Sequence, residues 1–337
     1  MLLAKTPLRI SLFGGGTDFP DWYKDRKGLV ISTTIDKYCY VLLRTLPPYF
    51  HFKYRLRYYQ MELTKNINQI KHPVIKNILR KYYKQKVGIE LNHFADIPGL
   101  SGLGSSSSFT VTMINLIHYF NGKSLTKYEI AKLALEFEQK ILKESVGSQD
   151  QVATAYGGFN CIDFHKDSFK VNKIKFNSEK LKKFENNSLL VYTGLSRHAE
   201  KLEKKKIDSI KSKTTYYQDI YDVANYAKKK LLIEPNKFLT EIPELLNETW
   251  KLKKRLNKNV SNNYIDNLYE HGIKNGAEGG KLLGSGAGGF LLFVCKNTEN
   301  KKRLVKSLKK SILVNFKTED KGTRIIFKNK DYYDTIK

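Results

Sequence analysis

The fold is decided at residues 98–108, which read PGLSGLGSSSS and run directly into the apolar stretch FTVTMINLIHYF at 109–120. A β-rich run at 88–94 precedes the loop, so the order is strand, glycine loop, helix. Glycines let backbone amides face a ligand, serines supply caps and hydroxyl groups, and the helix N-terminus adds partial positive charge. Together these features predict an anion site that would fit a polyphosphate.

Two other interpretations of this loop explain less of its sequence. A flexible loop with one serine N-cap would explain a single G-x-G followed by serine, but the run Ser105 to Ser108 exceeds what capping requires. The P-loop spacing G-x-x-x-x-G-K-[ST] is absent, because Gly122-Lys123-Ser124 has Ile117 at the position of the first glycine. A second Gly-Lys pair, Gly280-Lys281, is followed by leucine. The loop is therefore predicted to be a phosphate site of another kind.

A late glycine cluster, GSGAGG at 284–289, satisfies the pattern G-x-G-x-x-G. The apolar strand FLLFVC follows it at 290–295, where a dinucleotide-binding site needs a helix. No H-R-D or D-F-G appears, which excludes the protein-kinase arrangement. A turn between two strands is the simplest interpretation, and its four glycines indicate that a ligand or another backbone comes close.

The first glycine cluster, LFGGGTD at 12–18, ends a strand and precedes Phe19-Pro20. Two interpretations stay open here. Asp18 caps a short helix after a glycine turn, or its carboxylate accepts hydrogen bonds from polyol hydroxyls beside exposed glycine amides.

Composition limits the class of protein. At 337 residues the chain predicts two domains of ordinary size. Its formal net charge of +27 would by itself suggest a nucleic-acid or anionic-membrane partner. The lysines, however, lie mostly on expected helix faces among Asn and Glu, and no arginine-rich tract appears. A solvated lysine-rich surface, which also attracts phosphorylated metabolites, is the interpretation adopted.

The compartment is predicted from cysteines and apolar runs. Three cysteines, Cys39, Cys161 and Cys295, lie far apart and favour neither a disulfide framework nor a zinc site. Lys5 and Arg9 interrupt the first apolar stretch, so it reads poorly as a signal peptide. The longest apolar runs fall far below the roughly 18 residues of a membrane span. We expect a cytoplasmic protein without a membrane partner.

The order of expected elements predicts an α+β fold rather than a doubly wound sheet or a β/α barrel. Strands dominate the first hundred residues, helices the middle, and strands return near the end. The weakly periodic, lysine-rich stretch 166–187 separates the regions, which gives domains at 1–175 and 176–337. The expected strands are 8–13, 29–35, 38–44, 88–94, 159–164, 188–193, 289–295, 312–316 and 323–327, and the expected helices are 105–120, 126–142, 149–156, most of 197–272, and 298–310.

Two acidic residues after the glycine loop at 98–108, Glu138 and Asp150, are candidates for a function. At 100° per residue Glu138 lies roughly 70° from the centre of an apolar helix stripe, whereas Glu136 lies roughly 130° away. Glu136 can pair with Lys140, but Glu138 needs another partner, so Glu138 is either structural or a ligand. Asp150 precedes the helical run VATAY, where it either caps the helix or takes part in chemistry. The stripe is formed by Ile130, Ala134, Phe137 and Ile141.

Taken together, the three glycine clusters resemble the GHMP kinase family, named for galactokinase, homoserine kinase, mevalonate kinase and phosphomevalonate kinase. The order and spacing match across nearly the whole chain: residues 7–18 look like the substrate motif, 98–108 like the nucleotide motif and 281–289 like the late glycine motif. The family's fold is a two-domain α+β fold with the active site in the interdomain cleft. PLRISLFGGGTD looks most like the sugar kinases acting on D-glycero-D-manno-heptose 7-phosphate, with fucose kinases as near relatives.

The resemblance implies a kinase that uses ATP and Mg²⁺. Ser106 and Glu138 would ligate the metal, Asp150 would accept or orient the proton of the acceptor hydroxyl, and Arg9 would stabilise charge on the transferred phosphoryl group. The implied ATP-binding residues are Pro98, Gly99, Gly102, Leu103, Gly104, Ser105, Ser106 and Ser107. The implied sugar-binding residues are Gly14, Gly15, Gly16, Thr17, Asp18, Gly286, Ala287, Gly288 and Gly289. Arg197 is a candidate for the substrate's own phosphate, or simply a surface charge near a helix start.

Four functions are compatible with these features of the sequence. The first is phosphorylation of the anomeric hydroxyl of D-glycero-D-manno-heptose 7-phosphate to the 1,7-bisphosphate, for nucleotide-activated heptose biosynthesis. The second is a kinase for an unphosphorylated sugar such as fucose. A basic nucleic-acid-binding protein and a sensor that has lost catalysis come from other classes; the intact Ser106, Glu138 and Asp150 speak against the sensor. The expected partners are ATP and a sugar phosphate, not nucleic acid, and the oligomeric state is left open.

Overall fold

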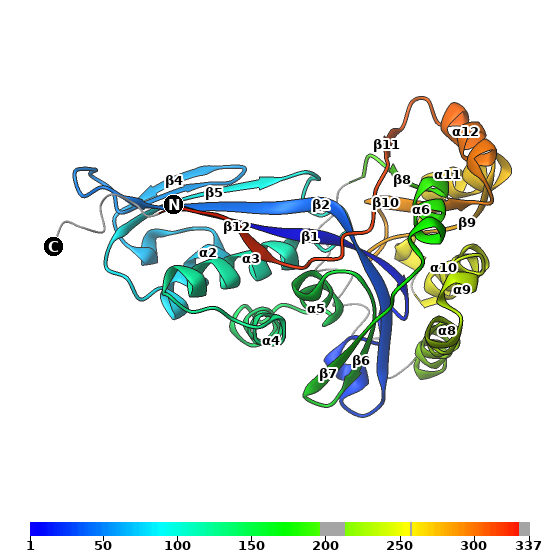
Figure 1. The fold of residues 1–337 in the computed structure, drawn as a ribbon, viewed down its shortest axis with the longest axis horizontal. Coiled ribbons are helices and arrows are strands. Elements are labelled where there is room, and N and C mark those ends of the chain that lie inside the picture. Colours follow the sequence, from blue (N-terminus) through cyan, green and yellow to red (C-terminus); the bar gives the residue numbers. More distant parts are fainter. Residues whose placement is uncertain (196–212, 257, 330–337) are drawn as a thin grey trace.

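The computed structural model describes residues 1–195, 213–256 and 258–329. Two antiparallel-rich sheets organise them (Figure 1). The larger has eight strands in the order β12-β1-β2-β5-β3-β4, with β6 paired to β2 and β7 to β6. The smaller has the order β11-β8-β10-β9. The mixed fold confirms the predicted α+β class.

The strands of the first sheet are β1 (Leu2–Phe13), β2 (Gly28–Leu46), β3 (Tyr54–Arg57), β4 (Met61–Thr64), β5 (Gly88–Ala95), β6 (Phe159–His165), β7 (Ser168–Lys173) and β12 (Arg324–Lys328). Those of the second are β8 (Ser188–Tyr192), β9 (Ala277–Leu282), β10 (Phe290–Cys295) and β11 (Ile312–Val314). The helices are α1 (Pro20–Tyr23), α2 (Pro73–Tyr82), α3 (Ser105–Phe120), α4 (Lys127–Glu136), α5 (Gln149–Tyr156), α6 (Ser178–Asn187), α8 (Thr214–Ile233), α9 (Pro235–Phe238), α10 (Ile242–Leu256), α11 (Asn263–Lys274) and α12 (Thr298–Ser307), with a π-helical turn at Phe137–Ile141 and short 3₁₀ turns at Ile67–Gln69 and Lys258–Val260.

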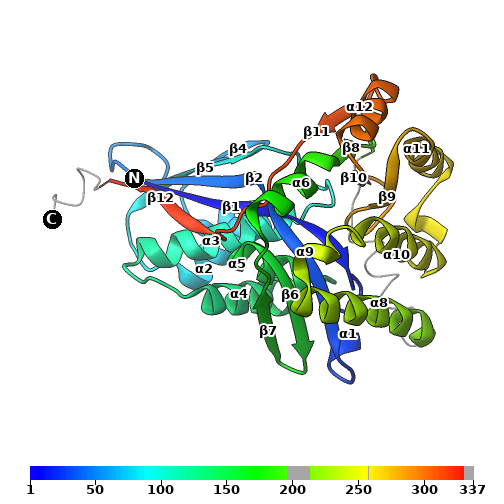
Figure 2. The same cartoon turned by 45° about the vertical axis from the view of Figure 1, so that its right-hand side comes forward.

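The helix α3 lies at the centre of the first half because its sequence is apolar nearly all round. Every residue from Ser107 to Ile117 is buried, as expected for a helix enclosed by other elements. Figures 1 and 2 both place α2, α3 and α4 on one face of the first sheet. The chain therefore runs from the glycine loop at 98–104 into the interior of the molecule, where the start of α3 lies next to β1.

One long strand, β2, replaces the two runs predicted at 29–35 and 38–44. The polar pair Asp36-Lys37 separates those runs, and the pairing with β1 shifts there, from Pro7 opposite Tyr38 to Leu8 opposite Ile35. Since proline has no N–H to give to a sheet, this is a suitable place for a bulge. The strand continues through it and pairs with β6 at one end and β5 at the other.

The predicted domain division at 175/176 needs one correction. The strands of the two sheets do separate between β7 and β8, but β12 pairs with β1 in the first sheet. Nor is 166–187 a mere separator, since it forms β7 and α6. A core cluster also joins β1 side chains to those of β8 and β10, so the two halves pack tightly together.

The other predicted elements that fall on described residues agree with the structure, whereas the part of the predicted helical region at 197–212 lies outside them. The strands β3, β4, β7 and β9 and the helices α1, α2 and α6 were not predicted. No helix within the described ranges is long and apolar enough to cross a membrane.

Candidate active site

A cavity of about 470 Å³ lies where the three glycine clusters meet the start of α5. Thirteen of the predicted site residues line it: Arg9, Gly15, Gly16, Asp18, Gly102, Gly104, Ser105, Ser106, Ser107, Glu138, Asp150, Gly286 and Gly288. The residues Gly14, Thr17, Pro98, Gly99, Leu103, Ala287 and Gly289 belong to the same loops but are not part of the lining. Arg197 lies outside the described residues. The structure thus brings together segments that are far apart in the sequence.

The glycine loop at 98–104, which is predicted to bind phosphate and is called the phosphate loop below, ends at Gly104, directly before the first turn of α3. Gly104 has φ of 74°, in the left-handed region, and no side chain caps the helix there. A Cβ at Gly104 would lie 3.1 Å from Arg9 Cγ and 3.3 Å from Asp150 Oδ2, so glycine makes room for that pair. The first-turn amides and the helix dipole are left available to a negatively charged ligand.

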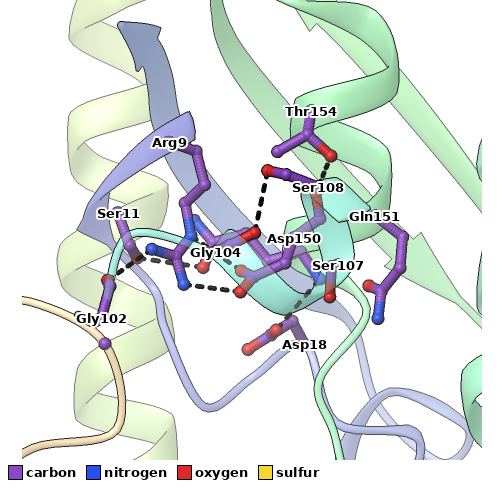
Figure 3. A network of polar contacts seen from close by, with 12 residues as sticks. Arg9, Ser11, Asp18, Gly102, Gly104, Ser107, Ser108, Asp150, Gln151 and Thr154 are labelled. Carbon is purple, nitrogen blue, oxygen red and sulfur yellow. Dashed lines mark hydrogen bonds and ion pairs between the residues drawn. The ribbon is translucent and has the colours of Figure 1, made fainter. Parts of the chain in front are cut away.

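Arg9 and Asp150 form a bidentate ion pair at the wall of the cavity (Figure 3). Arg9 Nε donates to Asp150 Oδ1 and Nη2 donates to Oδ2, both at 2.7 Å. Arg9 Nη1 donates to the carbonyl of Gly102 at 2.6 Å, which ties the pair to the phosphate loop. The N-cap of α5 is Ser148, so the helix-capping interpretation of Asp150 is wrong. Its carboxylate faces the cavity instead.

Asp18 joins the first glycine cluster to α5. Its carboxylate accepts hydrogen bonds from the amides of Gly16 at 2.8 Å and Gln149 at 3.1 Å. The short helix α1 has Phe19 at its N-cap and no side-chain cap, so the prediction that Asp18 caps this helix is wrong. Burial raises the pKa of Asp18, and the charge of Asp150 adds to that rise. Asp18 therefore fixes the start of α5 and lines the cavity.

Glu138 lies in the π-helical turn and is 1% exposed, as its helix angle predicted. Single π turns inside helices occur frequently at functional sites. Glu138 Oε2 accepts hydrogen bonds from the Ser107 hydroxyl at 2.9 Å and from the Gln151 amide. The other oxygen, Oε1, has no hydrogen bond of good geometry within the described residues, although the Thr110 hydroxyl lies close enough to lower the pKa of this carboxyl. Burial raises the pKa of this carboxyl to about 7.

This carboxylate fits a divalent cation. A buried oxygen without a partner is uncommon, and a hard cation beside it would supply the missing interaction. The described residues contain no cluster of three or more His, Cys, Asp or Glu that could hold a metal by itself. That agrees with Mg²⁺, which commonly uses one or two protein ligands together with substrate phosphates. Ser107 rather than Ser106 contacts Glu138, while Ser106 is exposed and lines the cavity.

The buried carboxyl of Glu138 predicts a pH-dependent stability. Its pKa is raised from 4.5 to about 7, so the folded chain binds more protons than the unfolded chain between these values and loses stability as pH rises through them. In the absence of Mg²⁺, the free energy of unfolding of Glu138→Gln, relative to that of the wild type, should increase by about 2 kcal/mol from about pH 5.5 to about pH 8. Urea unfolding with a chelator present measures this.

The matched control is Glu136→Gln, which removes a carboxylate at a partly exposed position two residues earlier. If the difference in free energy of unfolding between Glu138→Gln and the wild type is the same at both pH values, the raised pKa of Glu138 is contradicted.

The late glycine loop touches the phosphate loop directly. A Cβ at Gly284 would lie 2.5 Å from Gly102 Cα, and one at Gly289 would lie 2.3 Å from the carbonyl oxygen of Ser101. The loop connects β9 to β10, so the turn between two strands is confirmed, and the expected close backbone is the phosphate loop. Lys253 on α10 donates to the carbonyls of Leu282 at 2.8 Å and Gly284 at 2.7 Å, which holds the loop in place.

Comparison with known proteins identifies the family. A D-glycero-alpha-D-manno-heptose 7-phosphate kinase from Campylobacter jejuni is 31% identical over 318 residues, covering 91% of this chain and 92% of that protein. The chain belongs to the GHMP kinase family. The model of the GHMP kinases N terminal domain matches residues 68–158, which include the phosphate loop, Glu138 and Asp150.

Two further relatives extend this result. A bifunctional fucokinase/GDP-fucose pyrophosphorylase from Arabidopsis thaliana is 24% identical over 323 residues, which is 88% of this chain but 30% of that protein. The crystal structure of a D-glycero-D-manno-heptose 1-phosphate kinase from Bacteroides thetaiotaomicron is 25% identical, has a TM-score of 0.79, and covers 98% of this chain and 100% of that one. The likeness in fold therefore extends over 98% of this chain.

Several residues of this GHMP kinase site were missed from the sequence. Ser11 lies two positions after Arg9 on β1, and Gln149 directly precedes Asp150; both line the cavity. Strand alternation after Arg9 could have indicated Ser11, since residues i and i+2 share a face. Lys281 is 4% exposed and donates to the carbonyl of Leu12 at 2.8 Å, linking the late and first glycine clusters. Lys281 begins the late glycine motif at 281–289 but was given no role from the sequence, and no local pattern indicated Lys253.

Proposed function

We propose that this GHMP kinase transfers the γ-phosphoryl group of ATP to the anomeric hydroxyl of D-glycero-D-manno-heptose 7-phosphate, giving the 1,7-bisphosphate for nucleotide-activated heptose biosynthesis. The observation that carries the kinase chemistry is the Arg9–Asp150 pair beside the uncapped start of α3. The sugar substrate is inferred from the name of the Campylobacter jejuni relative, whose match covers 91% of this chain and 92% of that protein.

The phosphate side of the cavity is built from the start of α3. There the amides of the first turn and the helix dipole would bind the triphosphate, as anions bind at other helix N-termini. Glu138, with Ser106, would hold Mg²⁺, which supplies neutralisation of the phosphate charge when bound. The pairing of Ser107 with Glu138 places a second hydroxyl at the same point.

The proton and the new bond involve Asp150. The anomeric hydroxyl would donate a hydrogen bond to the Asp150 carboxylate, and its oxygen would attack the γ-phosphorus. As that O–P bond forms, the proton passes to Asp150, the bond from the γ-phosphorus to the bridging oxygen breaks, and ADP leaves. Arg9 orients the carboxylate by two hydrogen bonds and adds positive charge beside the transferred group.

The function is tested by ADP release from Mg²⁺-ATP with D-glycero-D-manno-heptose 7-phosphate, the unphosphorylated heptose, fucose, galactose and mevalonate. We expect turnover with the 7-phosphate and at least about a hundredfold lower kcat/KM for the others, because a site built for a charged group loses much of its binding without one. A preference for fucose would instead support a fucokinase activity, as in the name of the Arabidopsis thaliana relative. Heptose 7-phosphate would then no longer be the proposed substrate.

A further inference from the structure

A second side-chain pair, Ser11 with Gln149, lies beside Arg9 and Asp150. The hydroxyl of Ser11 donates to Gln149 Oε1 at 3.0 Å. Gln149 is 3% exposed and Ser11 is 6% exposed, yet both line the cavity. The backbone amide of Gln149 is held by Asp18 at 3.1 Å. This pair is therefore buried, fixed from two directions, and next to the space where a substrate would bind.

The amide nitrogen of Gln149 has no hydrogen-bond partner within the described residues. Leaving a buried donor unsatisfied costs about 1 to 3 kcal/mol, so such groups normally have a partner. Both the main-chain amide and the side-chain oxygen of Gln149 are already used by protein groups. The remaining N–H₂ group of a residue that lines the cavity is thus free to bind a ligand there.

The two pairs have different surroundings. Arg9 and Ser11 share one face of β1, and they meet Asp150 and Gln149, which are consecutive in the first turn of α5. The charged pair is bonded to the phosphate loop through the Gly102 carbonyl. The neutral pair lies toward the first glycine cluster, where a Cβ at Gly15 would be 3.4 Å from Ser11 Oγ. Ser11 thus connects the Gln149 side chain to the first glycine cluster.

We propose that Gln149 is a sugar-binding residue whose side-chain amide hydrogen-bonds to a hydroxyl of the acceptor other than the one that is phosphorylated. Ser11 is the positioning residue that holds this amide. The proposal rests on the proposed sugar kinase activity. A neutral amide suits a hydroxyl, which can donate as well as accept, and an oriented amide rejects acceptors that lack this group.

The test combines enzyme variants with deoxy sugars. Wild type, Gln149→Leu and Ser11→Ala are assayed with D-glycero-D-manno-heptose 7-phosphate and with its 2-, 3- and 4-deoxy analogues. In the wild type, one analogue should show about a tenfold lower kcat/KM, the effect of one hydrogen bond. In Gln149→Leu the parent sugar should show that same loss, chiefly as a higher sugar KM, and removal of the critical hydroxyl should cost nothing further. Ser11→Ala should give a smaller loss of the same kind.

The control is Gln139→Leu, which removes an amide that donates to the Ser148 hydroxyl at 2.9 Å and is not part of the cavity lining. It should show the wild-type loss with the deoxy analogue. Equal losses with every analogue in wild type and Gln149→Leu would overturn the proposal while leaving the kinase intact. If Gln149→Leu fails to fold, Gln149→Glu is assayed in the same way and judged by the same comparison. If the wild type shows no turnover with the parent sugar, both this proposal and the proposed substrate are wrong.

Discussion

Replacement of Asp150 by asparagine is expected to lower turnover at least about a hundredfold while ATP still binds, since positioned acid–base groups contribute roughly 10²- to 10⁴-fold. The asparagine keeps the shape of the side chain but cannot accept the proton of the sugar hydroxyl. It also removes the charge that pairs with Arg9 through two hydrogen bonds of 2.7 Å. Steady-state ADP release gives the turnover number, and calorimetric titration gives the ATP affinity.

The matched control for this prediction is Asp163→Asn. Asp163 also forms an ion pair, with Lys228 at 2.6 Å, and its side chain is 31% exposed compared with 26% for Asp150. It is not part of the cavity lining, so its replacement should change turnover less than about twofold and stability by about 0 to 1 kcal/mol. Turnover of Asp150→Asn within tenfold of the wild type would remove Asp150 from the mechanism.

The phosphate loop and its helix could be predicted because their signals are local. The order of strand, glycines and serines, and a helix that is apolar all round, lies within a single stretch of chain, and the structure has α3 where the sequence placed it. Helix geometry likewise placed Glu138 roughly 70° from the centre of the apolar stripe, at the border of the buried face, and in the structure this residue is buried. The π turn that contains Glu138 has no such signal, since the sequence there reads as an ordinary continuation of α4.

Contacts between distant segments could not be predicted. β12 pairs with β1 across more than three hundred residues, which no periodicity reveals. The bonds of Asp18 and Asp150 illustrate the same limit, because the local sequence offers each residue a helix-capping role that the structure does not show. Only the folded chain shows that Asp18 reaches the amide of Gln149 and that Asp150 reaches Arg9. The family resemblance, rather than local pattern, carried the assignment of Asp150 to catalysis.

Replacement of Gly284 by alanine is expected to lower kcat/KM for ATP by about a hundredfold, because misplacing a binding element by about 1 Å can cost that much. Gly284 has φ of 66°, and its new Cβ would lie 2.5 Å from the Cα of Gly102. Two backbones cannot approach so closely, so the late glycine loop and the phosphate loop must separate. The effect thus tests whether the second half of the chain holds the phosphate loop in its working position.

The control has to distinguish this separation from backbone strain alone. Gly122, after the end of α3, has φ of 79°, and a Cβ there would meet nothing within 4 Å. Gly122→Ala should therefore cost about 1 kcal/mol or somewhat more in stability, from the left-handed backbone, with little change in the KM for ATP. If Gly284→Ala and Gly122→Ala show the same modest loss of stability and the same ATP kinetics, the contact between the two loops has no role in binding the nucleotide. A loss of ATP affinity confined to Gly284→Ala, with the melting temperatures of the two variants similar, would show that the late loop sets the position of the phosphate loop.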